Sequence, residues 1–115
     1  MMLCSLSQIT HVLDQVMVSR QRVTLRVGAS ALPSRILALD VGGRCFQLKQ
    51  PWQGAPASLT QPGTPFTLTA MYQGCLVLLT ATITEAPPGA DPTTLFARFP
   101  SSMQVCDACV LAITP

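Results

Sequence analysis

The sequence predicts a mostly β fold, a small antiparallel six- to seven-stranded (split) β-barrel with one short N-terminal helix. Three observations predict it. A helical apolar pattern is confined to residues 5–18, alternation with period two follows within residues 21–104, and turns rich in glycine or proline separate the alternating segments. A closed or nearly closed sheet is favoured, because closure removes exposed strand edges. The length of 115 residues suits a single domain, 1–115.

The predicted helix, residues 5–18, has apolar residues at three- and four-residue intervals. Ser5 or Ser7 is suited to cap its start, because a serine hydroxyl accepts a hydrogen bond from an otherwise unpaired backbone amide. The apolar stripe either covers one end of the barrel or binds a partner, and we expect it to cover the barrel. Its members are Leu6, Ile9, Val12, Leu13 and Val16.

The segments after the helix are expected to be strands that end at turn residues. Gly42-Gly43 is expected to supply the positive φ of a tight hairpin turn, and Gln73-Gly74 to form a second turn. The segment 75–85 is apolar on both faces in its first half, which is typical of a central strand. The expected strands are residues 22–27, 34–41, 44–49, 65–72, 75–85 and 93–99, followed by an apolar tail, 103–113, that is strand or helix.

The composition disfavours catalysis. Only 10% of the residues are charged, and five carboxylates and one histidine are spread along the chain. General acid–base chemistry needs titratable groups brought together with shifted pKa values. A Ser–His–Asp or Cys–His arrangement would have to use His11, which lies on the predicted helix. We therefore expect a protein that is not an enzyme and that holds no cofactor.

The composition also narrows the class of partner. A net charge of +2, with Arg20, Arg22 and Arg26 as the one basic cluster and no interleaved aromatic residues, argues against nucleic acid. The longest apolar run, residues 75–79, is far below the roughly 20 residues that span a bilayer, so no membrane insertion is expected. Five cysteines without a disulfide-like spacing fit a reducing cytoplasm. The low charge leaves an apolar surface, which favours a protein partner or self-association.

A pattern of glycines and alternating apolar residues follows the loop in the middle of the chain. Its residues are Gly63, Phe66, Leu68, Gly74, Val77, Leu79 and Ile83, followed by the segment 96–100. With this pattern, the order of elements from residue 5 to residue 104 resembles the N-terminal (PilZN) domain of YcgR-type flagellar brake proteins. In that family a helix leads into a strand and a pair of strands, and a loop then precedes such a pattern.

This resemblance implies a non-catalytic regulatory or protein-interaction module in bacterial motility or cyclic di-GMP signalling. In the family, a following PilZ domain binds cyclic di-GMP through an Arg-x-x-x-Arg stretch at the junction and an Asp/Asn-x-Ser-x-x-Gly turn. At the matching place, residues 104–110, the glutamine is present as Gln104 but the arginines are absent, and we expect no PilZ domain to follow. The resemblance thus implies cyclic di-GMP binding only if a PilZ domain is supplied elsewhere.

Two short motifs leave alternatives open. Arg22 and Arg26 spell Arg-x-x-x-Arg and are candidate cyclic di-GMP ligands in a divergent PilZ-type sensor, although they also form the outward face of an alternating strand. Cys106 and Cys109 form one Cys-x-x-Cys, a weak candidate for a metal- or thiol-responsive site, because a structural zinc needs four ligands. The more ordinary interpretation is two small buried residues, and we expect no metal.

The apolar tail is the candidate partner interface. In the family the equivalent chain leads out of the barrel toward a second domain. Without that domain its apolar side chains are exposed unless they dock on the barrel or on another chain. The candidate interface residues are Val105, Cys109, Val110, Leu111 and Ile113.

Overall fold

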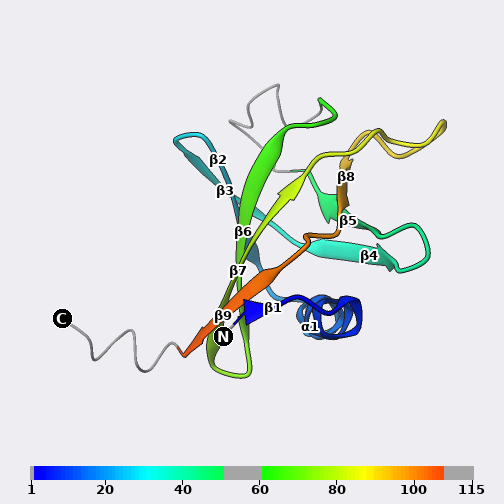
Figure 1. Cartoon of the computed structure of the whole chain (residues 1–115). Coiled ribbons are helices and arrows are strands. Elements are labelled where there is room, and N and C mark those ends of the chain that lie inside the picture. The colour runs from blue at the N-terminus through cyan, green and yellow to red at the C-terminus, as the bar shows by residue number, and fades with distance from the viewer. Residues whose placement is uncertain (1, 51–60, 108–115) are drawn as a thin grey trace.

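Two antiparallel sheets and one helix make up the structure, a computed structural model that describes residues 2–50 and 61–107 (Figure 1). In chain order the elements are β1 (Met2–Leu3), α1 (Leu6–Val18), β2 (Val23–Val27), β3 (Ser30–Ser34), β4 (Ile36–Asp40), β5 (Cys45–Lys49), β6 (Pro65–Tyr72), β7 (Cys75–Thr82), β8 (Thr94–Arg98) and β9 (Met103–Asp107). The large sheet has the order β1-β9-β7-β6-β2-β3, and the small sheet the order β4-β5-β8. The mostly β fold with one helix is confirmed, as a split barrel in two sheets that do not close.

Helix α1 begins where its sequence predicts. Ser5 is extended, with φ −76° and ψ 135°, and its hydroxyl accepts a hydrogen bond from the Gln8 amide. The helix packs against β4 and β6 (Figure 1). Its apolar stripe is buried as expected except at the first position, where Leu6 remains 38% exposed. The buried members are Ile9, Val12, Leu13 and Val16.

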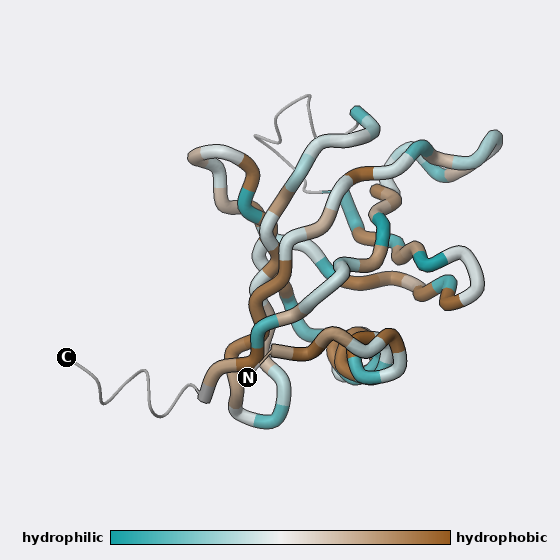
Figure 2. Tube along the Cα trace, in the orientation of Figure 1, coloured by the Kyte–Doolittle hydropathy of each residue, from teal (hydrophilic) through white to brown (hydrophobic). Residues whose placement is uncertain are grey.

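The core lies between the two sheets and the helix. Alternation places it there, because every second residue of a strand points to the same face of the sheet. In β2, for example, Val23 and Leu25 are fully buried while Arg26 is exposed. In Figure 2, hydrophobic stretches lie along α1, β4 and the lower part of the large sheet, which surround this core. Its largest buried side chains include Phe46, Phe66, Leu48, Leu68 and Met103.

Strand β7 is central, as predicted, and it connects the two sheets. It pairs with β6 along its whole length through a turn at Gln73 and Gly74, which both have positive φ, and it pairs with β9 on its other side. The predicted strand 75–85 ends earlier, at Thr82, because the chain then leaves the large sheet. Ile83 forms a bridge to Ala97 of β8, so the continuation of β7 meets the small sheet.

The predicted strand 34–41 corresponds to β4, whereas β3, which belongs to the other sheet, was not predicted. Strand β3 forms a hairpin with β2 and lies at the edge of the large sheet. Pro33 is tolerated there, because an edge strand has a side without ladder hydrogen bonds. The chain changes sheets at Arg35. Among the described residues, the final apolar segment is the strand β9.

The turn between β4 and β5 occurs where it was predicted but for a different reason. Arg44, and neither glycine, has the positive φ, at 54°. Gly43 lies close to Asp40, because a Cβ atom there would be 2.5 Å from Asp40 Oδ2 and would displace this exposed carboxylate. The same carboxylate accepts a hydrogen bond from the Gly43 amide at 3.0 Å.

Candidate functional site, a basic hollow where the chain changes sheets

A hollow of about 630 Å³ lies where the chain passes between the two sheets. Four of the seven Lys and Arg residues line it, and none of the carboxylates whose side chains the structure describes does so. We call it the basic hollow. Its lining residues are Arg20, Arg22, Pro33, Ser34, Arg35, Lys49 and Gln50.

The register of β2 and β3 brings two of these cations together. Val23 pairs with Ser34 at the last step of the antiparallel ladder. Arg22 precedes Val23 and Arg35 follows Ser34, so this last pair brings both arginines to the same end of the hairpin, where both line the basic hollow. Like charges that lie close together at the end of a ladder repel each other.

Two hydrogen bonds hold Lys49 beside this pair. The Lys49 amide donates to the Arg35 carbonyl at 3.0 Å. The Ser34 hydroxyl donates to the Lys49 carbonyl at 2.6 Å, and Ser34 is only 6% exposed. A short bond from a buried side chain fixes the end of β5 against the β3–β4 junction. Lys49 is thereby brought to Arg35 although 14 positions separate them in the sequence.

Gln21 fixes the segment that carries the remaining cation. Its side-chain amide donates to the Met71 carbonyl at 2.6 Å and accepts from the Met71 amide at 2.8 Å, as a strand neighbour would. Arg20, just before it, has φ 55° and donates its amide to the Met17 carbonyl at the end of α1. Arg20 and Arg22 therefore stand on either side of a residue tied to β6.

The basic hollow has the electrostatic character of an anion-binding site. Its four cations are exposed, and within the described part of the chain none forms an ion pair. Guanidinium groups offer forked donors that match carboxylates and phosphates. Arginine remains charged throughout the physiological range, which suits binding better than proton transfer.

The candidate pair Arg22 and Arg26 is separated by this geometry. Arg26 lies on the outward face of β2 and Arg22 directly precedes this strand, so four steps of extended chain separate them by about 13 Å. Arg22 lines the basic hollow and Arg26 does not. Sequence reasoning missed Arg35 and Lys49. In the sequence, Arg35 precedes one strand and Lys49 ends another. Only the pairing of these strands shows that the two cations lie together.

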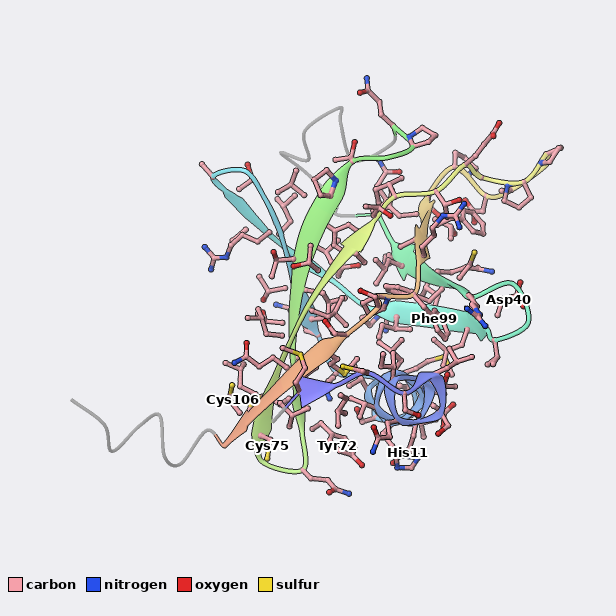
Figure 3. All side chains as sticks on the ribbon, viewed as in Figure 1. His11, Asp40, Tyr72, Cys75, Phe99 and Cys106 are labelled. Carbon is pink, nitrogen blue, oxygen red and sulfur yellow. The ribbon has the colours of Figure 1, made fainter. Side chains whose placement is uncertain are left out.

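The cysteines that the structure describes do not gather into a metal site. Cys75 pairs with Asp107 and Cys106 with Leu76, so the two cysteines occupy neighbouring strands but point to opposite faces of the sheet (Figure 3). Among the described residues no three His, Cys, Asp or Glu side chains stand close enough to hold a metal ion. Cys109, the other half of the Cys-x-x-Cys, lies outside the described residues.

Of the candidate interface, the structure describes Val105. It lies in β9 opposite Val77, and its side chain is 9% exposed in the core. Most of its apolar surface is thus covered by the chain itself. The other candidates lie outside the described residues, and they are Cys109, Val110, Leu111 and Ile113.

A second hollow, between α1 and β4, contains His11. Ser7 and Asp14 also line it, which is the residue set of a catalytic triad. In the described structure, however, no hydrogen bond joins His11 to either residue, and the Ser7 hydroxyl pairs with that of Ser5 at 3.1 Å. His11 instead packs edge-on against Tyr72, with ring centroids 6.1 Å apart (Figure 3). This arrangement lacks the contacts of a nucleophile and its base.

Two of the acids support turns. Asp40 accepts the Gly43 amide in the β4–β5 turn, and Asp91 accepts both the amide and the hydroxyl of Thr93, each at 2.8 Å, before β8. These hydrogen bonds from Thr93 lower the pKa of Asp91 below its ordinary value. An acid held ionised in an exposed turn has a local structural role and is unsuited to donate a proton near neutral pH.

No family model and no curated protein matches the sequence. Among solved structures, the YcgR-N domain of YcgR from Escherichia coli aligns with a TM-score of 0.72 and 16% identity, over 90% of this chain and 93% of that chain. The chain has the fold of the YcgR N-terminal domain. The PilZN-like fold expected from the sequence is thereby confirmed.

Longer proteins contain the same YcgR-N fold. YcgR from Escherichia coli in complex with c-di-GMP aligns with a TM-score of 0.73 and 16% identity over 92% of this chain. MrkH from K. pneumonia in its apo state aligns with a TM-score of 0.71 and 14% identity, also over 92%. This chain spans 46% of that YcgR chain and 43% of that MrkH chain. The described residues contain no helix with the length and apolar character needed to cross a membrane.

Proposed function

We propose that the chain is a non-catalytic regulatory module that binds a protein partner or a second copy of itself in cyclic di-GMP signalling or bacterial motility. The observation that carries this proposal is the likeness to the YcgR-N domain over 90% of the chain. We further propose that residues 1–115 act as one domain and that the protein works in the cytoplasm. The apolar tail, with Cys109, Val110, Leu111 and Ile113, remains part of the proposed partner surface.

Binding, and not catalysis, is supported by the distribution of reactive groups. Among its described lining residues the basic hollow gathers four cations, and the Ser34 hydroxyl donates to a backbone carbonyl and not to a side-chain base. The second hollow has a histidine that forms no hydrogen bond to Ser7 or Asp14 in the described structure. Catalysis needs groups that exchange protons or attack a substrate from fixed geometry. A surface of fixed cations favours recognition of an anionic partner.

An alternative function is supported by the position of Arg22. Arg22 shares the basic hollow with three other cations. In this alternative the chain is a divergent sensor that binds cyclic di-GMP itself, with Arg22 as a ligand and Arg26 farther along the same face. We favour the first proposal because the described lining of the basic hollow contains no aromatic side chain on which a guanine could stack. Under that proposal cyclic di-GMP acts only through a PilZ domain on another protein.

Calorimetric titration of the purified chain with cyclic di-GMP separates the two functions. The interaction module gives no saturable heat. Saturable binding that Arg22→Ala abolishes and the matched variant Arg98→Ala retains would establish the sensor, because both variants remove one exposed arginine. The two outcomes exclude each other.

Deletion of the gene in its own organism tests the role in signalling. We expect altered swimming, most clearly when cellular cyclic di-GMP is high, with an unchanged cyclic di-GMP concentration by mass spectrometry. A binding module acts on a partner and leaves the nucleotide pool alone. A changed pool would indicate turnover, and unchanged swimming at both low and high cyclic di-GMP would contradict the motility assignment.

A further inference from the structure

The basic hollow places like charges side by side. The last pair of the β2–β3 ladder brings Arg22 and Arg35 to one end of the hairpin, and the backbone bond from Lys49 to Arg35 adds a third cation. Neighbouring like charges are destabilising, and the described lining of the hollow offers them no carboxylate. Arrangements that lower the stability of the fold locally are expected at functional sites. The charges of this hollow are left for a partner to neutralise.

The backbone of the hollow narrows the chemistry of that partner. Phosphate cradles use free backbone amides at helix N-termini or in glycine-rich loops. Here the amides of Arg20, Lys49 and Gln50 already donate to the carbonyls of Met17, Arg35 and Thr93. These three amides are therefore not available to a ligand, whereas the four cationic side chains are. Four long cationic side chains from three separate segments suit several spaced carboxylates better than one compact phosphate.

The size and rigidity of the site fit a peptide segment. A hollow of about 630 Å³ exceeds the needs of a single ion and lies within the usual range of ligand sites. Its three segments are fixed by Gln21 to Met71, by Ser34 to Lys49 and by the β2–β3 ladder. Fixed backbones lower the entropy that binding must overcome.

From charge complementarity we propose that the basic hollow binds an acidic segment of a partner protein, in which several Asp or Glu side chains pair with Arg20, Arg22, Arg35 and Lys49. This inference rests on the proposed interaction function and names the class of partner. The acidic segment gives the partner its orientation and a fast, salt-sensitive association.

Fluorescence anisotropy with a labelled hexaglutamate peptide, and a hexaglutamine peptide as control, tests it. At about 0.01 M ionic strength the chain binds hexaglutamate and not hexaglutamine, and the affinity falls steeply by about 0.15 M. Arg22→Glu/Lys49→Glu weakens binding by roughly tenfold or more. Arg26→Glu/Arg98→Glu, with the same net charge, weakens it by less than about threefold. Because all four positions are exposed, both variants are expected to fold, and circular dichroism checks this.

Equal weakening by the two double variants would overturn the inference, since net charge alone would then explain binding. Tighter binding of inorganic tripolyphosphate or cyclic di-GMP would overturn it in favour of a phosphate site. Salt-sensitive self-association of the chain, abolished by Arg22→Glu/Lys49→Glu, would make a second copy the occupant instead. If hexaglutamate fails to bind while gene deletion still alters swimming, the acidic partner is excluded and the interaction function stands.

Discussion

At the scale of the residue, Gln21 shows how one side chain extends a sheet. Its amide group makes both of the hydrogen bonds that a backbone neighbour would make with Met71. The segment between α1 and β2 is thus held to β6 without being a strand. The backbone of Arg20 and Arg22, on either side of Gln21, is therefore fixed as well. Long cationic side chains need such a fixed backbone if they are to converge on one hollow.

Replacing Gln21 with Ala tests this role. The loss of two hydrogen bonds, discounted for their exposure, is expected to lower the free energy of unfolding by about 1 kcal/mol in urea titrations. Gln8→Ala is the control, because the exposed Gln8 side chain makes no hydrogen bond in the described structure. Equal effects of the two substitutions would show that Gln21 does not fix this segment.

At the scale of the element, α1 depends on its packing. A 13-residue helix is marginal alone in water, so its stability comes from the apolar face that it places on β4 and β6. That face was predictable, because helical periodicity and a serine cap are local signals. The β6–β7 hairpin was predictable for the same reason, from two alternating runs joined by Gln73 and Gly74.

The helix face gives a second prediction. Leu13 is 1% exposed, and Leu13→Ala is expected to lower the free energy of unfolding by about 2–5 kcal/mol, because it removes buried methyl groups and leaves a cavity. Gln15→Ala, on the exposed side of the same helix, should change it by less than about 0.5 kcal/mol. Thermal and urea unfolding followed by circular dichroism measure both. A near-neutral Leu13→Ala would mean that α1 does not cover the core.

Other elements could not be predicted from local signals in the sequence. Strand β3 was missed because Pro33 argues against a strand unless that strand is known to be an edge. The early end of β7 was missed because apolar alternation continues through Ile83, which forms a bridge to Ala97 of the other sheet. In both cases the position in the sheets, and not the residue pattern, decides the structure.

At the scale of the whole molecule, the basic hollow is a product of topology. The sequence shows the cluster Arg20, Arg22 and Arg26, but the fold excludes Arg26 and adds Arg35 and Lys49. Their convergence requires the β2–β3 register and the bond from Ser34 to Lys49, neither of which a periodic pattern reveals. A small chain with few charges thereby concentrates most of its cations at one place.

A double-mutant cycle between Arg22 and Arg35 tests this placement most directly. Because the two charges repel, Arg22→Gln and Arg35→Gln should each raise the free energy of unfolding at about 0.01 M ionic strength. The double variant should gain less than the sum of the two, by about 0.5 kcal/mol, since one repulsion is relieved only once. At about 1 M salt this difference should vanish. Additive effects at both salt concentrations would show that the two arginines are not neighbours, and the basic hollow would then not exist as described.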